Sequence, residues 1–225
     1  MIQVKNLTKK YTNGKIETHV LKGIDLEVKT GEFLGIMGKS GAGKSTLMYQ
    51  MSILDEPTSG EILIDGTDIL SLSTKEKTEF RLNRLGYVFQ DYALVPELTS
   101  LENIMVPLLM RGLSTESAKK RALQALESVG LVNKDKNLPS QLSGGEQQRV
   151  SIARAVAQDP IILFADEPTA NLDSTSSANI VEVLMDLNKK GQTIVMVTHE
   201  KEYTNHCNRI IFLEDGKIIR EEKLR

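Results

Sequence analysis

Apolar and polar residues alternate with a period of two through the first third of the chain, and this period is typical of half-buried strands. We expect strands over residues 2–4, 20–28, 33–37 and 61–64. The pairs Asn13-Gly14 and Thr30-Gly31 favour turns between them. The N-terminal third is therefore predicted to be rich in β-structure.

The pattern changes to a helical period between about residues 100 and 157, where Gly112, Gly130 and Pro139 interrupt it. Beyond residue 160, strand and helix patterns alternate. The expected strands cover 161–165, 193–197, 209–213 and 217–219, and the expected helix covers 174–190. Apolar strands that alternate with helices predict a mostly parallel sheet covered on both faces. We expect one α/β domain, 1–225, with the helical middle inserted into it.

The composition excludes several classes of protein. With 40% hydrophobic and 26% charged residues, the chain resembles a soluble globular protein. Its net charge of -2 does not favour nucleic acid or an anionic membrane as the main partner. The single cysteine, Cys207, excludes an intramolecular disulfide and fits a reducing cytosol. The apolar runs 104–110 and 161–165 are far shorter than the roughly 20 residues of a membrane span, and the N-terminus lacks the apolar block of a signal peptide. We expect no direct membrane insertion.

The most informative local motif follows an apolar strand and precedes a helix. Its residues are Gly38, Lys39, Ser40, Gly41, Ala42, Gly43, Lys44, Ser45 and Thr46. This is the P-loop pattern, in which glycines let successive N–H groups face a phosphate at a helix N-terminus. We expect Lys44 to reach the β- and γ-phosphates of ATP and Ser45 to ligate Mg²⁺. The alternative is a glycine turn that matches the pattern by chance.

Two carboxylates, Asp166 and Glu167, follow the apolar run 161–165. They are expected at the carboxyl edge of a buried strand, where open α/β sheets bind ligands. Asp166 suits Mg²⁺, which prefers oxygen ligands, and Glu167 suits a general base for the attacking water. The alternative is that both acids simply end the strand.

The discriminating segment is Leu142-Ser143-Gly144-Gly145-Glu146-Gln147-Gln148-Arg149, followed by a helical pattern. It resembles LSGGQ, the signature of ATP-binding cassette (ABC) proteins. A serine and two glycines before a helix can form a second anion-binding site. The alternative is a serine N-cap followed by flexible glycines.

Four further residues match the order of ABC motifs. Tyr11 resembles the aromatic that stacks on adenine, Gln90 the Q-loop glutamine, Asp173 the D-loop aspartate and His199 the switch histidine. Taken alone, each has an ordinary alternative: a strand aromatic, a surface polar residue, a helix N-cap and a strand-end histidine. Their joint order carries the resemblance, which covers essentially the whole chain.

The resemblance implies the ABC ATPase fold. That fold has a P-loop NTPase core, here about 1–90 and 158–225, with a mostly parallel sheet, an N-terminal antiparallel β subdomain and an α-helical subdomain at about 91–157. It implies ATP hydrolysis by in-line attack of water, with ATP and Mg²⁺ as cofactors. The implied catalytic residues are Lys44, Gln90, Glu167 and His199, and the implied metal ligands are Ser45, Gln90 and Asp166.

The resemblance also implies the partners. Two copies would pack head to tail, with each ATP between the P-loop of one subunit and Ser143, Gly144, Gly145 and Glu146 of the other. A separate integral membrane permease would place the protein at the inner face of the cell membrane, in the cytoplasm. Rival interpretations are a soluble ABC ATPase acting on chromosomes or ribosomes, a nucleotide kinase or GTPase-like switch, and a module that holds ATP without turnover.

Several stretches resemble one subfamily, which serves lipoprotein-releasing, macrolide-exporting and cell-division permeases. They are residues 54–61, 87–90, 98–104 and 165–169. Lipoprotein-release, macrolide or peptide export is the expected role, and the alternative is a cell-division type that transmits a mechanical signal without solute transport. An apolar set downstream of Gln90 is expected to grip the permease or to pack the helical core: Leu94, Val95, Leu98, Leu101, Ile104, Met105, Leu108 and Met110.

Three positions depart from the family pattern. Glu146 stands where glutamine is common, and a carboxylate accepts hydrogen bonds but cannot donate them. Lys39 adds positive charge to the P-loop. The segment 200–203 after His199 resembles the subfamily only loosely.

Overall fold

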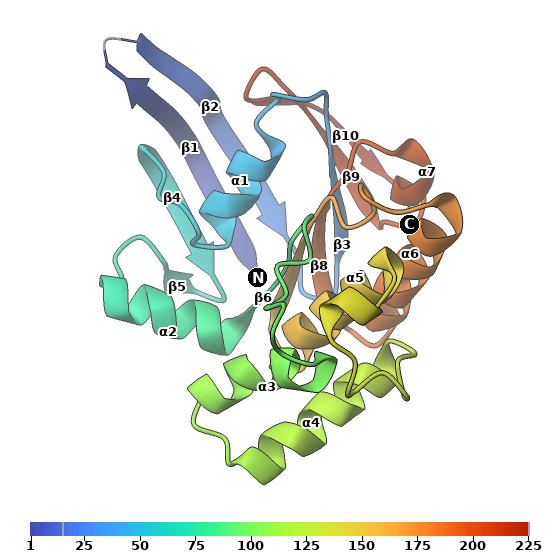
Figure 1. Ribbon diagram of the computed structural model, residues 1–225. Coiled ribbons are helices and arrows are strands. Elements are labelled where there is room, and N and C mark those ends of the chain that lie inside the picture. The colour runs from blue at the N-terminus through green and yellow to red at the C-terminus, as the bar shows by residue number, and fades with distance from the viewer. Residues whose placement is uncertain (15, 225) are drawn as a thin grey trace. The chain divides into compact units, whose positions relative to one another are not determined.

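The computed structural model describes residues 1–14 and 16–224, and these residues separate into two units with their own cores (Figure 1). Unit 1 joins Met1–Glu79 to Gly191–Arg225, and unit 2 is Phe80–Lys190. Helix α2 (Thr74–Arg84) runs across the division. The expected core at about 1–90 and 158–225 and helical lobe at about 91–157 remain a prediction, because compactness alone does not define functional lobes.

An antiparallel sheet forms the N-terminal part of unit 1. It contains β1 (Ile2–Asn13), β2 (Ile16–Val28), β4 (Ser59–Ile64) and β5 (Thr67–Asp68), in the order β2-β1-β4-β5. All neighbouring strands pair antiparallel. The first residues of β1 alternate between buried and exposed side chains, as the period of two predicts. The expected antiparallel β subdomain is therefore confirmed.

Three parallel strands and one antiparallel edge strand make the second part of unit 1. These strands are β3 (Phe33–Met37), β8 (Thr193–Val197), β9 (Arg209–Glu214) and β10 (Lys217–Lys223), in the order β10-β9-β3-β8. Strand β3 pairs parallel with β8 and β9, and every residue of β3 and β8 is buried. The hairpin β9–β10 is antiparallel and turns through Asp215 and Gly216, both with positive φ. Helices α1 (Lys44–Met51) and α7 (Lys201–Thr204) belong to the same unit.

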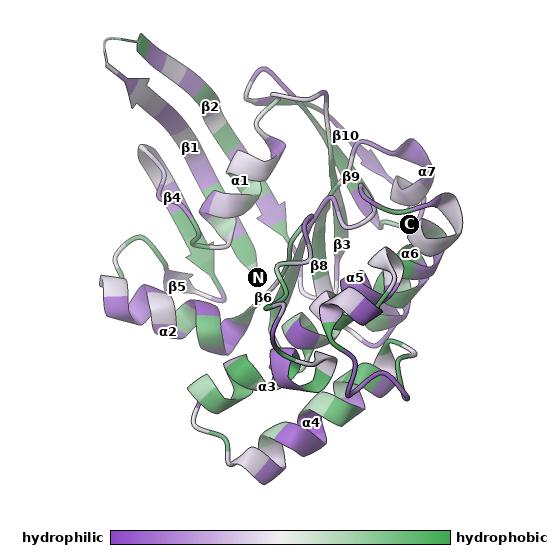
Figure 2. Ribbon diagram, viewed as in Figure 1, coloured by the Kyte–Doolittle hydropathy of each residue, from purple (hydrophilic) through white to green (hydrophobic). Residues whose placement is uncertain are grey.

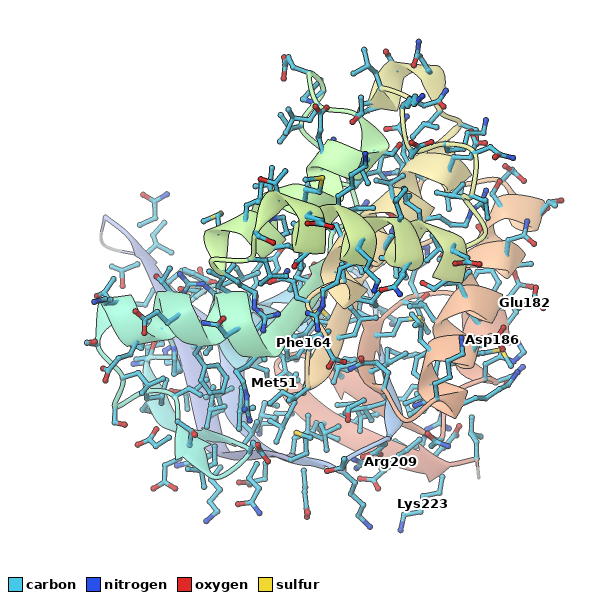
Figure 3. All side chains as sticks on the ribbon, turned by 90° about the horizontal axis from the view of Figure 1, so that it is seen from below. Met51, Phe164, Glu182, Asp186, Arg209 and Lys223 are labelled. Carbon is cyan, nitrogen blue, oxygen red and sulfur yellow. The ribbon has the colours of Figure 1, made fainter. Side chains whose placement is uncertain are left out.

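Ion pairs hold the amino-terminal edge of these parallel strands. Arg209 at the start of β9 contacts Glu32 at 2.6 Å and Glu221 of β10 at 3.2 Å. Figure 3 labels Arg209 and Lys223, which are paired across β9 and β10. These contacts tie the turn before β3 to the C-terminal hairpin, at the edge opposite to the P-loop.

Unit 2 contains two parallel strands and most of the helices. Its elements are β6 (Leu85–Val88), α3 (Ser100–Met110), α4 (Thr115–Ser128), a 3-10 turn at Pro139–Gln141, α5 (Gly144–Val156), β7 (Ile162–Asp166) and α6 (Ser174–Lys189). Figure 2 shows hydrophobic and hydrophilic residues interleaved along α3 and α4, as expected of helices half-buried in a core. Helices α3 and α4 end two residues before the predicted interruptions at Gly112 and Gly130, and α5 ends one residue before the predicted end of the helical region at about 157.

The predicted strands over 33–37 and 193–197 are confirmed at their bounds, and the expected helix over 174–190 ends one residue earlier. Four elements lie where no element was expected: β5, α2, β6 and α7. Helix α2 has no buried residue, so its sequence lacks the apolar stripe that marks a helix. The other three are two to four residues long, too short to show a period.

Candidate functional site

The P-loop lies in unit 1 between β3 and α1 and wraps around the ammonium group of Lys44. Its Nζ donates hydrogen bonds to the carbonyls of Gly38 at 2.9 Å and Lys39 at 3.1 Å. Only 7% of Lys44 is exposed. Gly41 and Gly43 have φ of 79° and 99°, in the left-handed region that favours glycine. Two carbonyls of the loop therefore face the lysine, and the N–H of Ala42 closes the loop on the carbonyl of Lys39 at 3.2 Å.

Gly38 is required by a close approach of backbone. A Cβ at this position would lie 2.3 Å from the carbonyl oxygen of Leu213, at the end of β9. The hairpin turn supports the loop as well, because the N–H of Gly216 donates to the carbonyl of Ala42 at 3.2 Å. The chain's last hairpin thus shapes a loop about 170 residues earlier.

His199 lies at the same edge of unit 1. It follows β8, which pairs parallel with β3, so both the P-loop and His199 leave the carboxyl ends of neighbouring strands. Thr198 is buried and its hydroxyl accepts from the N–H of Glu200 at 3.1 Å, while the His199 side chain is exposed. Lys44 and His199 are thereby brought to one edge, as the resemblance implies.

Unit 2 places the two carboxylates at the end of β7. Asp166 is 6% exposed, and the Tyr87 hydroxyl donates to its Oδ2 at 3.3 Å. Glu167 has φ of 43°, a conformation that is uncommon for a residue with a side chain and that stores backbone strain. Strand β6 pairs parallel with β7 through Val88 and Ala165. Gln90, two residues beyond β6, therefore leaves the same edge as Asp166 and Glu167.

Hydrogen bonds from other segments of unit 2 hold the Q-loop. Asn171 donates to the carbonyl of Gln90 at 3.3 Å, and Gln148 of α5 donates to the carbonyl of Phe89 at 3.5 Å. Arg154 of α5 donates to the carbonyl of Tyr92 at 2.9 Å and also to that of Ala93. Tyr92 has a φ of 59°, another left-handed residue. The signature helix α5 and the Q-loop are therefore mechanically joined.

The signature forms a capped helix start. The Ser143 Oγ accepts from the N–H of Glu146 at 3.3 Å, and the Glu146 carboxylate accepts from the N–H of Ser143 at 2.8 Å, which is a capping box. Lys134 pairs with Glu146 at 3.0 Å. The Ser143 N–H and the Lys134 ammonium hold the pKa of Glu146 below its usual value. The capping alternative is therefore realised, and the expected phosphate contact of Ser143 remains a prediction.

The two signature glycines allow close packing. A Cβ on Gly144 would lie 2.9 Å from the Tyr92 hydroxyl, and one on Gly145 would lie 3.0 Å from Oγ of Ser176. Asp173 caps α6, because its carboxylate accepts from the hydroxyl of Ser176 at 2.7 Å and from the N–H of Ser176 at 2.9 Å. These two hydrogen bonds lower the pKa of Asp173. The N-cap alternative for Asp173 is thus realised too.

Tyr11 lies in β1 with 44% of its surface exposed, and its hydroxyl donates to Asp55 at 2.8 Å. This exposure leaves room for a stacking partner. Lys39 and Ser40 at the tip of the P-loop are also exposed.

The apolar set downstream of Gln90 divides by burial into three groups. Ile104 and Leu108 are fully buried and pack the core of unit 2. Val95 and Met110 are exposed, at 43% and 68%. The half-buried members are Leu94, Leu98, Leu101 and Met105. The buried pair fits the core expectation and the exposed pair fits the partner expectation, so the two expectations apply to different residues.

Several residues with a place in these networks were not expected from sequence: Lys9, Asp55, Tyr87, Lys134 and Arg154. Each acts through a contact with a residue more than 10 positions away. Residues 54–61 were noted as a subfamily motif, which was the one available indication for Asp55.

Among the residues that the structure describes, none of the helices is both long and apolar enough to span a bilayer. The match to the ABC transporter family model covers residues 21–170. The chain is 48% identical over 202 residues to the lipoprotein-releasing system ATP-binding protein LolD of Aquifex aeolicus, with 90% of each protein covered. It is 45% identical to the macrolide export ATP-binding/permease protein MacB of Pasteurella multocida, over 97% of this chain and 34% of that protein.

A solved structure has nearly the same fold. It is a dimeric, post-hydrolysis state of the ATP-binding cassette MJ0796 bound to ADP and Pi, a protein of Methanocaldococcus jannaschii. The TM-score is 0.93 at 44% sequence identity, with 100% of this chain and 99% of that chain covered. The likeness therefore extends over all of both chains.

Proposed function

Because the chain belongs to the ABC transporter family and is an ATP-binding ATPase of the LolD, MacB and MJ0796 type, we propose that two copies close head to tail around two MgATP. The P-loop of one copy and the signature of the other would hold each triphosphate. The observation that supports this most is that one chain carries a lysine-bearing loop and a second, lysine-free glycine loop, in separate units. Neither loop alone is a complete nucleotide site.

The chain's own groups would perform hydrolysis as follows. Glu167 would take a proton from the attacking water, while Lys44 and His199 would stabilise charge that develops on the γ-phosphate. Gln90 would orient the water and the metal. The strained backbone of Glu167 supports the first assignment, because strain concentrates at residues whose position matters for function.

The oxygen donors fit Mg²⁺. Asp166 is a buried carboxylate and Ser45 a hydroxyl in the first turn of α1, both of the hard-oxygen type that Mg²⁺ prefers. With the amide oxygen of Gln90 they are proposed as the protein ligands. When bound, the ion would neutralise phosphate charge. Loss of the γ-phosphate would then remove a contact from the interface, so the pair would open.

We also propose a membrane permease as the partner, with the protein at the inner face of the membrane and no nucleic acid involved. The relatives support a lipoprotein-release or macrolide-export type. Four exposed apolar residues between the Q-loop and the end of α3 would form the docking surface: Val95, Val106, Leu109 and Met110. The neighbouring reading frame in the genome tests this proposal. If it encodes a membrane protein with few spans and a large extracytoplasmic domain, that protein is the expected partner. If it encodes a nucleic-acid-binding protein instead, the proposal is contradicted.

The substitution Glu167→Gln tests the dimer and the base together. The amide cannot accept the proton, so turnover should fall by about 100-fold or more while ATP binding persists. The ATP-bound pair should then remain closed and elute as a dimer in size-exclusion chromatography with MgATP. Glu182→Gln on the exposed face of α6 (Figure 3) is the matched control and should keep wild-type turnover. A Glu167→Gln protein that stays monomeric in saturating MgATP would refute the proposal.

A further inference from the structure

The carboxylate of Asp55 is a point of convergence in unit 1. Asp55 lies in the turn that follows α1, and its side chain accepts from the Tyr11 hydroxyl at 2.8 Å, from Lys9 Nζ at 2.9 Å and from Gln50 Nε2 at 3.0 Å. The N–H of Glu56 donates to the same carboxylate at 2.8 Å. Such a set of donors fixes the carboxylate in one orientation.

Lys9 places its charge against the Tyr11 ring. Its Nζ lies 4.7 Å from the ring centroid, within the range of a cation–π contact. Only 9% of Lys9 is exposed, so its side chain is held in place by its neighbours and does not move freely in solvent. One face of the ring is thereby occupied. A planar ligand can stack only on the other face.

Gln50 connects this cluster to the P-loop helix. It is fully buried in α1, the helix that begins with Lys44, and α1 lies against β1 in unit 1 (Figure 1). Asp55 therefore links an aromatic of β1 to the helix that carries the phosphate-binding lysine. This carboxylate helps to fix the position of the Tyr11 ring relative to Lys44, together with a hydrogen bond between the Tyr11 hydroxyl and Thr46 of the same helix.

The charges of the cluster are matched. Burial acts to raise the pKa of Asp55, but hydrogen bonds from Lys9, Tyr11 and the Glu56 N–H outweigh it and the pKa is lowered. Burial and the Asp55 carboxylate raise the pKa of Tyr11. Asp55 thus stays ionised at neutral pH and the phenol stays protonated, so the hydrogen bond keeps its donor and its acceptor.

We infer that Asp55 is a positioning residue for the nucleotide base: it holds the Tyr11 ring, with Lys9 behind it, as a preformed platform for one face of a purine. The inference rests on the proposed function, in which Tyr11 stacks on the adenine of ATP. It gives a physical role to the subfamily motif at 54–61, which that function did not use. A ring that is held before binding loses less freedom when the base arrives.

The substitution Asp55→Asn tests the inference. It keeps the shape but removes the charge that holds Tyr11 and Lys9, so KM for ATP should rise about threefold to tenfold with kcat within about twofold of wild type. The inhibition constant of inorganic tripolyphosphate, which has no base, should not change. Glu56→Gln, in the same turn and paired instead with Lys77, is the matched control and should leave both constants unchanged.

Tyr11→Phe provides a second, milder variant. It keeps the stacking ring and removes the hydroxyl that meets Asp55, so it should raise KM for ATP by less than Asp55→Asn. The double variant should be no weaker than Asp55→Asn alone, because both changes remove the same bond. Additive effects of the two changes would overturn the inference, as would equal weakening of ATP and tripolyphosphate by Asp55→Asn.

Tyr11→Ala separates this inference from its premise. If it leaves KM for ATP unchanged, Tyr11 does not stack on the base and the premise fails. If it raises KM for ATP but Asp55→Asn does not, the platform exists and the role of Asp55 is refuted. If both raise KM for ATP and spare tripolyphosphate, the inference stands.

Discussion

The chain has two glycine loops that lead into helices, and the two helices begin in opposite ways. Helix α1 begins after Gly43, which has no side chain to cap it and has a left-handed φ. Helix α5 begins after Ser143, whose capping box with Glu146 meets the N-terminal N–H groups from within the chain. The first loop is therefore built for oxygen atoms that a ligand supplies. The second already bonds the N–H groups of Ser143 and Glu146 within the chain.

This difference suits the proposed order of events. A loop with an uncapped helix start and a buried lysine can bind a triphosphate in a single subunit. A loop in which two of the N–H groups already have acceptors within the chain gains less from a free phosphate, and we expect it to contribute when a partner presents a nucleotide in fixed position.

The largest effect should come from Gly38, the glycine of the first loop that packs against backbone. In Gly38→Ala the new Cβ would meet a backbone carbonyl at 2.3 Å, which cannot move without shifting β9. We expect a loss of about 1–3 kcal/mol of stability and a loss of ATP affinity of about tenfold or more. Titration with a fluorescent ATP analogue and thermal unfolding would measure both.

Gly144→Ala is the matched change in the second loop. Its new Cβ would meet the hydroxyl of Tyr92 at 2.9 Å and Cδ2 of Leu172 at 3.2 Å, both at the ends of side chains and not in the backbone. The ATP affinity of the single subunit should stay within about twofold of wild type, because this loop does not hold the nucleotide alone. Equal losses in the two glycine variants would contradict the contrast.

A smaller effect should follow from Ser143→Ala, which removes the N-cap of α5. Loss of such a cap costs about 1 kcal/mol, a shift of about 2–4 °C in Tm for a chain of this size. Monomeric ATP affinity should be unchanged, whereas ATP-dependent dimerisation in the Glu167→Gln background should weaken. Ser143→Asp, which can still cap the helix, should restore Tm but not dimerisation. If monomeric ATP binding falls instead, the second loop is not independent of the first.

The smallest effect concerns the pair Lys134–Glu146. Because the folded pKa of Glu146 is lowered from 4.5 by the Ser143 N–H and by Lys134, its stabilisation is fully present above about pH 4.5 and is lost as pH falls through the folded value. Lys134→Met should reduce this part of the stability by less than about 1 kcal/mol, since the pair is partly exposed. Between pH 7 and pH 3.5, the Tm of Lys134→Met should therefore fall less than the Tm of the wild type.

Glu146→Gln is the control for that measurement. The amide oxygen of Gln still accepts the capping hydrogen bond but does not titrate, so the part of the fall in Tm at low pH that is due to Glu146 should vanish. Adding Lys134→Met to this variant should not change the pH dependence of Tm any further. An unchanged acid profile in Glu146→Gln would show that Glu146 is not the titrating group.

Much of the fold follows from patterns of near neighbours in the chain. Strand β3, the helix after the P-loop and the turn at Thr30 and Gly31 lie where their sequences predict them, because apolar periods and turn residues act locally. Helix α2 and strand β6 were not predicted from the sequence. The first has no buried face and the second has only four residues, so no period was available.

The sequence by itself determined the family, the two glycine loops, the acidic strand end and the residues expected to carry hydrolysis. Each of these is recognised from residues that lie close together in the chain. Only the tertiary structure decided which groups support them: Asp55 meets Tyr11 across 44 positions, and Tyr87 meets Asp166 across 79. It also decided why Gly38 must be glycine, because the obstructing carbonyl belongs to Leu213. The physical reason is that such contacts depend on how strands pair and helices pack, which no local pattern records.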